Sequence, residues 1–208
     1  MNAADNTENT PDTRTAIMEA TYAALCKHGY ANLTMQAIAD EFDKTKAVLH
    51  YHYDTKEDLL VAFLDYLLDR FLDTLDIETI DDPEERLVAL VDALLLGTHE
   101  PRSETDHWEY HTALLDIRAQ APHNDAFREQ LTTNYRHIEA TAAAIIEDGI
   151  ERGVFREVDP ERAATWLFAT INGARLHQVT LDESDVAEDV RAAIVEEWLD
   201  WLRRPNGE

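Results

Sequence analysis

Three helix starts fall close together in residues 33–60, which read LTMQAIADEFDKTKAVLHYHYDTKEDLL. The first is Thr34, whose hydroxyl can accept a hydrogen bond from the free N–H groups of the helical turn that follows. Thr45 can begin a second helix in the same way. Thr55 begins a third together with Asp58, which takes the place of Glu or Gln in a capping box. Apolar residues follow each start at helical spacing, which predicts two short helices and the beginning of a longer one.

A tight turn centred on Asp43 joins the two short helices. Asp adopts the left-handed backbone of such a turn more readily than most residues other than Gly and Asn. Two helices joined by a short turn form a helix-turn-helix, which can place its second helix in the major groove of DNA. We therefore interpret residues 45–51 as a recognition helix.

The N-terminal end of this recognition helix has residue types that read DNA. Lys44, Thr45 and Lys46 stand where side chains meet base edges or the nearby backbone, and Lys can donate to guanine O6 and N7. Ala47 and Val48 have methyl groups that can contact the methyl group of thymine. For each lysine the alternative is a solvated surface charge.

The same stretch resembles the DNA-binding motif of the tetracycline-repressor-like (TetR) family of bacterial and archaeal regulators. The positions that match the family pattern are Thr34, Ile38, Ala39, Thr45, Leu49, His52 and Lys56. Three positions differ, because the family usually has Gly at Asp43, Tyr at His50 and Phe at Tyr53. The resemblance covers about 30 residues, and the rest of the chain agrees with the family in length and helix count.

The resemblance implies further contacts with DNA. In the family, the positions of Thr34, Tyr51, His52 and Lys56 contact phosphates. Gln36 lies on the exposed face of the first motif helix and could reach a base or a phosphate. His50 is also a candidate contact, with a place in the core as the alternative.

Caps and apolar spacing predict an all-α chain of about nine helices. We expect a disordered tail at 1–9, a helix-turn-helix DNA-binding domain at 10–54 and a larger ligand-binding and dimerisation domain at 55–208. Helices after the motif are predicted at about 56–75, 83–97, 104–120, 125–152, 160–179 and 184–203. The inner face of the helix at 160–179 should hold Ala163, Leu167, Ile171, Ala174 and Leu176. Asp182 or Ser184 should cap the last helix, with Val190, Ile194, Trp198 and either Trp201 or Leu202 inside.

The last two helices, at about 160–179 and 184–203, are candidates for a homodimer interface. One is rich in Ala and contains Gly173, and the other has two Trp; small residues let helices approach closely, and aromatics supply buried area. The resemblance implies a two-fold four-helix bundle with a second copy, whereas the alternative is that these helices complete the monomer core. A dimer would read a palindromic double-stranded operator, with half-sites about 34–36 Å apart.

The resemblance also implies that a small-molecule effector binds among the middle helices. Aromatic and polar residues that interrupt apolar stretches there are candidate ligand contacts: Phe63, Tyr66, Trp108, His111, Tyr135, Trp166 and Asn172. A site with few convergent polar groups suits an apolar ligand. For each of these residues the alternative is an ordinary core or surface position.

Charge is unusual for a DNA-binding chain, since Lys+Arg number 18 against 43 Asp+Glu, a net charge of −25. All four lysines lie between residues 27 and 56 with four acidic residues, whereas the rest has 14 arginines and 39 acids. Phosphate contacts require local basic groups, and lysine is retained only in the stretch that contains the predicted contacts. An acidic, lysine-poor surface is expected of a cytoplasmic protein from a halophile, and we interpret the chain as a haloadapted regulator from a halophilic archaeon.

Other functions find little support in the sequence. Cys26 is the only cysteine, which fits a reducing compartment, and with no signal peptide or apolar membrane span in view we expect a cytoplasmic protein. His107 and His111 have metal-compatible spacing, but no Cys or HExxH pattern joins them, so we predict no metal and no cofactor. Phosphate-loop, dinucleotide and nucleophile-elbow motifs are absent, so we predict no enzyme. The alternatives to a regulator are a helical small-molecule carrier and a protein-interaction domain without DNA binding.

Overall fold

The structure, a computed structural model, describes residues 13–42, 46–97, 104–182 and 185–204, apart from the side chains of 104–107. Most of these residues are helical, and they contain no strand beyond an isolated bridge between Phe155 and Arg203. They form nine helices when the last helical segment is counted once, so the predicted all-α fold is confirmed. None of the described helices is both long and apolar enough to cross a membrane. Predictions for 1–9, Asp43, Lys44, Thr45 and Ser184 concern positions outside the described residues.

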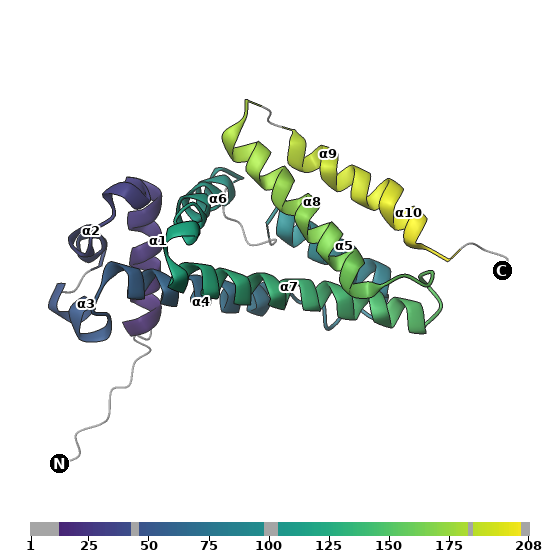
Figure 1. The fold of residues 1–208 in the computed structure, drawn as a ribbon, viewed down its shortest axis with the longest axis horizontal. Helices are drawn as coiled ribbons and strands as arrows, with labels where there is room; N and C mark the ends of the chain where they lie inside the picture. The colour runs from purple at the N-terminus through teal and green to yellow at the C-terminus, as the bar shows by residue number, and fades with distance from the viewer. Residues whose placement is uncertain (1–12, 43–45, 98–103, 183–184, 205–208) are drawn as a thin grey trace, which may run out of the picture. The chain divides into compact units, whose positions relative to one another are not determined.

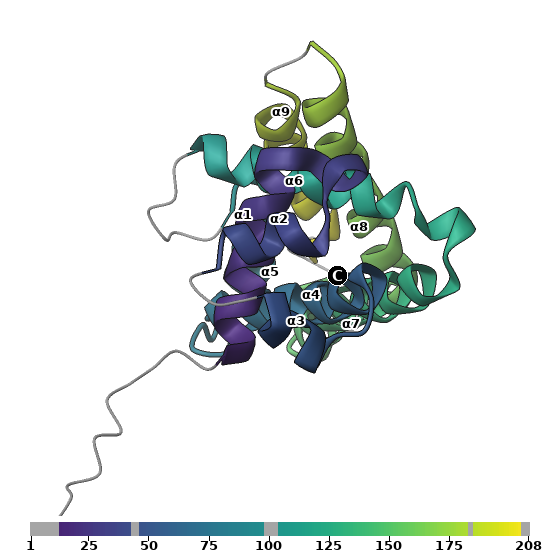
Figure 2. The ribbon, with the colours of Figure 1, turned by 90° about the vertical axis from the view of Figure 1, so that its left-hand side faces the viewer.

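The chain divides into two compact units, Met1–Tyr66 and Leu67–Glu208. The division falls within one long helix, later in the sequence than the functional boundary predicted at residue 54, which stays a prediction. Helices of the first unit are α1 (Thr13–Asn32), α2 (Met35–Asp40), α3 (Lys46–His52) and the first part of α4 (Lys56–Thr74) (Figure 1). Gly29 has φ 66° inside α1, a left-handed conformation that glycine adopts readily, and it breaks the helix there. Figure 2 shows α1, α2 and α3 from a second direction.

Two of the three helix starts predicted in 33–60 lie within the described residues, and both are confirmed. The Thr34 Oγ1 atom accepts a hydrogen bond from the Ala37 backbone N–H at 3.0 Å. The Asp58 backbone N–H donates to Thr55 Oγ1 at 3.0 Å, and the Thr55 N–H donates to Asp58 Oδ2 at 3.1 Å. This reciprocal pair is the predicted capping box with Asp as its acid, and it fixes where α4 begins.

The second unit contains the remaining helices. They are α5 (Pro83–Leu95), α6 (Glu104–Arg118), the short η1 (Ala121–His123), α7 (Asp125–Glu151), α8 (Pro160–Thr180), α9 (Val186–Ala192), the π-helical η2 (Ala193–Trp198) and α10 (Leu199–Leu202). Asp82, Asn124 and Asp159 accept hydrogen bonds from the first turns of α5, α7 and α8, as their sequence positions predict. The last helix begins at Val186, and the side chain of its N-cap residue, Asp185, does not cap it. The Ala187 N–H of its first turn donates instead to Gln178 Oε1 of α8 at 3.2 Å, so the prediction of Asp182 as the cap is wrong.

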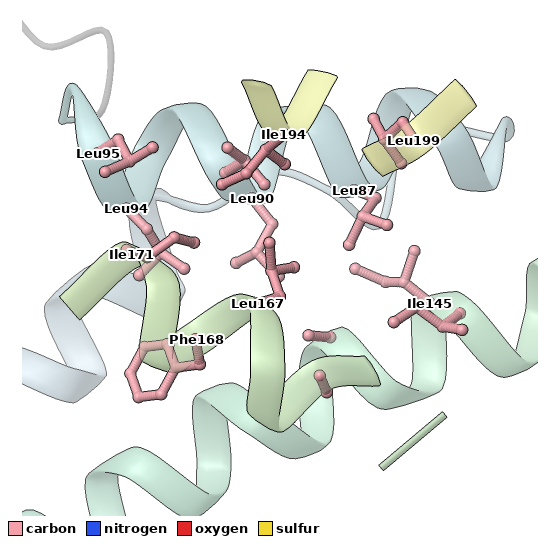
Figure 3. Packing of buried hydrophobic residues seen from close by; sticks show 14 of the residues in the cluster. Leu87, Leu90, Leu94, Leu95, Ile145, Leu167, Phe168, Ile171, Ile194 and Leu199 are labelled. Atoms are coloured by element: carbon pink, nitrogen blue, oxygen red, sulfur yellow. The ribbon is translucent and has the colours of Figure 1, made fainter. Parts of the chain in front are cut away.

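The core of the second unit lies between α5, α7, α8 and the last helical segment (Figure 3). Leu87, Leu90 and Leu94 of α5 meet Ile145 of α7 and Leu167 of α8, and each of these side chains is at most 3% exposed. Burying each such side chain stabilises the fold by about 1.5–3 kcal/mol relative to leaving it exposed. These helices therefore provide a rigid frame on which α6 packs, in contact with α7 and α8.

The inner face of α8 differs from the prediction at one position. Leu176 is 45% exposed, whereas Arg175 is 7% exposed and occupies the inward position. The Arg175 side chain donates to the Leu94 carbonyl oxygen in the last turn of α5, from Nε at 2.5 Å and with a second hydrogen bond from Nη2. Carbonyls at a helix C-terminus lack partners within the helix. Arg175 therefore turns inward to satisfy one of them, and Leu176, one residue further on, points outward.

Candidate nucleic-acid interface and effector site

The short helix α3 presents nearly all its side chains to solvent. Leu49 is fully buried and anchors the helix, while Tyr51 is 85% exposed. Lys46, Ala47, His50 and His52 are exposed as well, and Val48 is half-buried. A helix held by one apolar residue, with cationic, aromatic and methyl-bearing side chains free on its surface, has the form of a recognition helix. His50 is exposed, so the alternative of a place in the core is wrong for this residue.

Thr34 and Gln36 lie on the helix that precedes the turn. The side chain of Thr34 is exposed although its hydroxyl caps α2, so the residue is both structural and available at the surface. The Gln36 amide donates to Asp40 Oδ1 at 2.7 Å, one helical turn away. Asp40 thus fixes the Gln36 amide, and it also puts a negative charge beside this candidate contact.

Lys56, the last candidate of the motif, lies at the start of α4. Its Nζ atom lies 4.3 Å from the centre of the Tyr30 ring, a cation–π contact. Burial of the Tyr30 hydroxyl, and to a lesser degree the charge of Glu57, raise the pKa of Tyr30, which keeps the ring neutral. The contact fixes the Lys56 ammonium group over Tyr30, and a phosphate contact by Lys56 stays a prediction.

Four of the predicted effector residues lie on three helices of the second unit that pack together. Tyr135 of α7 donates from its hydroxyl to Asn172 Oδ1 of α8 at 3.4 Å. On α6, the ring of His111 lies with its centroid 5.8 Å from that of Trp108 and 4.9 Å from that of Tyr110. His111 is 6% exposed. We define the polar cluster as Tyr110, Arg118, Tyr135, Asn172 and Arg175.

Two arginines of the polar cluster were missed in the sequence. Arg118 ends α6, and its guanidinium lies 5.0 Å from the centre of the Tyr135 ring. Burial lowers the pKa of Arg175, and Arg118 lies close enough for its positive charge to lower it further. A signal did exist, since Arg175 continues the buried series Leu167, Ile171 and Ala174 at helical spacing.

The other three predicted effector residues are placed differently. Phe63 is buried and Tyr66 half-buried, and both belong to the first unit, so their part in an effector site stays a prediction. Trp166 is 47% exposed. Its ring stacks on that of Trp198 with centroids 5.3 Å apart. This surface position argues against a role for Trp166 in the effector site and in favour of the predicted subunit interface.

The helix-turn-helix, its exposed second helix and the larger helical unit define a DNA-binding regulator. Residues 17–63 match the family described as bacterial regulatory proteins of the tetR family, and residues 83–204 match the C-terminal region of BetI-type transcriptional repressors. The chain belongs to the TetR family. It is therefore a ligand-responsive, DNA-binding transcriptional regulator that acts as a dimer, not an enzyme.

Individual relatives span nearly the whole chain. A TetR transcription regulator from Haloarcula marismortui has 43% sequence identity and a TM-score of 0.83, covering 94% of this chain and 100% of its own. A transcriptional regulator from Saccharomonospora viridis, solved with choline, has 27% identity and a TM-score of 0.78 over 94% of this chain and 100% of its own. The transcriptional regulator TtgR of Pseudomonas putida is 28% identical over 93% of this chain and 90% of its own length.

Proposed function

We propose that the chain is a repressor that binds a palindromic operator as a homodimer and leaves it when a small-molecule effector binds. In each copy, α3 enters the major groove. Lys44, Thr45, Lys46, Ala47 and Val48 face base edges, and Thr34, Gln36, His50, Tyr51, His52 and Lys56 hold the backbone or flanking bases. The observation that supports this assignment is the exposure of α3. Within Lys46–His52, all of which the structure describes, Leu49 is the only fully buried residue.

The homodimer interface proposed is formed by α8 and the last helix, which run side by side (Figure 1). Six large hydrophobic side chains are strongly exposed within the described residues, and four of them lie on or at the ends of these two helices: Trp166, Leu176, Leu181 and Trp201. Apolar patches of this kind mark interaction surfaces. Trp166, Gly173 and Leu176 are spaced by seven and three residues, which places them along one face of α8.

The test of the DNA-binding proposal is selection from a random pool of duplex DNA by the purified protein at molar salt. A palindromic consensus with half-sites one helical turn or a multiple apart is the expected outcome. Recovery of no preferred sequence would contradict the proposal, as would a consensus for a single half-site bound by one copy.

Lys46→Ala is expected to lower affinity for the selected operator by about 1–3 kcal/mol and to relax the preference at one base pair, because a lysine contact with guanine is lost. Fluorescence anisotropy with the operator and its single-base variants measures both effects. Lys27→Ala is the control, since the Lys27 ammonium pairs with Glu41 at 2.5 Å. An equal loss for every sequence would instead make Lys46 a phosphate contact.

We also infer that the protein is adapted to high salt, which the acidic surface and the Haloarcula relative support. At low ionic strength the net charge of −25 repels itself, and molar salt screens this repulsion to within about 3 Å. Circular dichroism during dilution from molar KCl is expected to show loss of helix. Fully retained helix content and an unchanged melting temperature at low salt would contradict haloadaptation.

A further inference from the structure

Several arginines of the second unit are paired with carboxylates in the described part of the chain. Such pairs are Arg86–Asp148, Arg152–Asp81, Arg191–Asp92 and Arg203–Glu84. Arg118 and Arg175 differ, because neither forms an ion pair with any described residue. In a chain with 43 acidic residues against 18 basic ones, a place where two arginines meet without an acid is unexpected.

The hydrogen bonds of these two guanidinium groups are incomplete. Arg175 uses Nε and Nη2 on the Leu94 carbonyl oxygen, and its Nη1 forms no hydrogen bond with a described residue. The Nε atom of Arg118 is buried without a hydrogen-bond partner among the described residues. Arg86 and Arg156 also have a buried, unbonded Nε, but the guanidinium of Arg86 is neutralised by Asp148 at 3.3 Å, and that of Arg156 lies over the Trp201 ring, away from any second arginine of the cluster. Arg118 and Arg175 therefore have unused hydrogen-bond donors and a positive charge that no described carboxylate neutralises.

The positive charge of the polar cluster is real at neutral pH. Burial, reinforced by repulsion from Arg118, lowers the pKa of Arg175 to about 10, which still leaves the guanidinium protonated. Burial raises the pKa of Tyr110 and of Tyr135, so both phenols stay neutral and neither supplies a negative charge. A buried cation without a counter-charge is costly. An anion that binds here would remove that cost.

We propose that the effector is a small carboxylate with an apolar body, its anionic group bound by Arg118 and Arg175. This assignment rests on the proposed function, in that it names the ligand class of the effector site among α6, α7 and α8. Arginine matches the planar carboxylate with two parallel hydrogen bonds. The Tyr135 ring lies beside the Arg118 guanidinium, and its hydroxyl donates to Asn172 Oδ1. The Phe168 ring, centroid 5.0 Å from that of Tyr135, offers apolar surface to the ligand body.

The same geometry argues against a cationic effector such as the choline of the Saccharomonospora viridis relative. Quaternary ammonium groups bind to the open faces of aromatic rings. Here the guanidinium of Arg118 already lies over the Tyr135 ring, and Arg175 adds a second positive charge nearby. This proposal refines the apolar ligand expected from the sequence by adding an anionic group, which the two arginines would bind.

The test is the thermal unfolding midpoint of the full chain in molar KCl with titrated benzoate, phenylacetate or hexanoate. Each is compared with its neutral alcohol, and choline and inorganic phosphate are run in parallel. A ligand that binds only the native state raises the midpoint with concentration. At least one carboxylate is expected to raise it well beyond its alcohol, while choline and phosphate leave it unchanged.

Two variants link the shift to the cluster. Arg118→Gln is expected to weaken carboxylate binding about tenfold or more, since a charged hydrogen bond is lost. Arg156→Gln, on a guanidinium that lies over Trp201 outside the cluster, should bind as tightly as the wild type. Arg175→Gln should also lose binding, although it additionally removes the hydrogen bonds to Leu94.

Three results would overturn the proposal: a midpoint raised by choline or phosphate instead, no carboxylate exceeding its alcohol, or equal binding by Arg118→Gln. The measurement involves no DNA. Failure to select an operator would therefore contradict the proposed function, but it would not change the interpretation of the carboxylate measurement.

Discussion

Replacing Gly149 with alanine is expected to destabilise the folded protein by about 2–4 kcal/mol, although alanine is the better helix former. A Cβ atom at this position of α7 would lie 2.1 Å from Cδ2 and 2.4 Å from Cε2 of Phe155. Phe155 is 1% exposed and has little room to move. Its backbone N–H also donates to the Gly149 carbonyl oxygen at 3.0 Å, which ties the two residues together. Urea unfolding at molar salt measures the loss.

Gly173→Ala is the matched control for this substitution. Gly173 is also helical, but within one chain nothing lies within 4 Å of the position that a Cβ would take. The change should therefore stabilise the monomer fold by up to about 1 kcal/mol through helix propensity. Unchanged stability of Gly149→Ala would contradict the packing described. Because Gly173 lies on the proposed dimer face of α8, a loss in Gly173→Ala would come from the second chain and would support that interface.

Helix starts were predictable because their signals are local. Thr34, Asp82, Asn124 and Asp159 each satisfy N–H groups two or three residues further along the chain, so the sequence alone contains both partners. The exposure of α3 was predictable for the same reason. Leu49 is the largest aliphatic residue of this short helix, so the face that contains it is the one that packs inward, and the charged and aromatic residues remain exposed.

The register of the last helix could not be predicted in the same way. Helical spacing from Ile194 leads to Trp198, but the fully buried residue is Leu199, five positions on. Residues Ala193–Trp198 are π-helical, and the wider turn shifts the later side chains by one position. As a result Leu202 is buried and Trp201 is 49% exposed, which settles the alternative left open between them.

The polar cluster was only partly predictable for a similar reason. Tyr135 and Asn172 stood out as polar interruptions of apolar faces, and they do meet across α7 and α8. The buried position of Arg175 could not be predicted, because its hydrogen-bond partner is a carbonyl oxygen on another helix, 81 residues away in sequence. A buried arginine can be inferred only when the group that accepts its hydrogen bonds is known.

Leu176→Glu is expected to dissociate the dimer and to weaken operator binding at least about a hundredfold, because only paired recognition helices bind two half-sites tightly. The side chain is 45% exposed in one chain, so glutamate there should leave the monomer fold intact. In a two-fold interface the same residue enters from both copies. Each dimer would then bury two unpaired carboxylates, which costs several kcal/mol.

Leu96→Glu is the control, because Leu96 is similarly exposed at 43% but follows α5, outside the proposed interface. Sedimentation equilibrium in molar KCl gives the dimer dissociation constant, and fluorescence anisotropy with the selected operator gives DNA affinity. The two properties should change together in Leu176→Glu and in neither case for Leu96→Glu. If Leu176→Glu stays dimeric, the exposed face of α8 is not the subunit interface, because two buried carboxylates without partners could not be accommodated there.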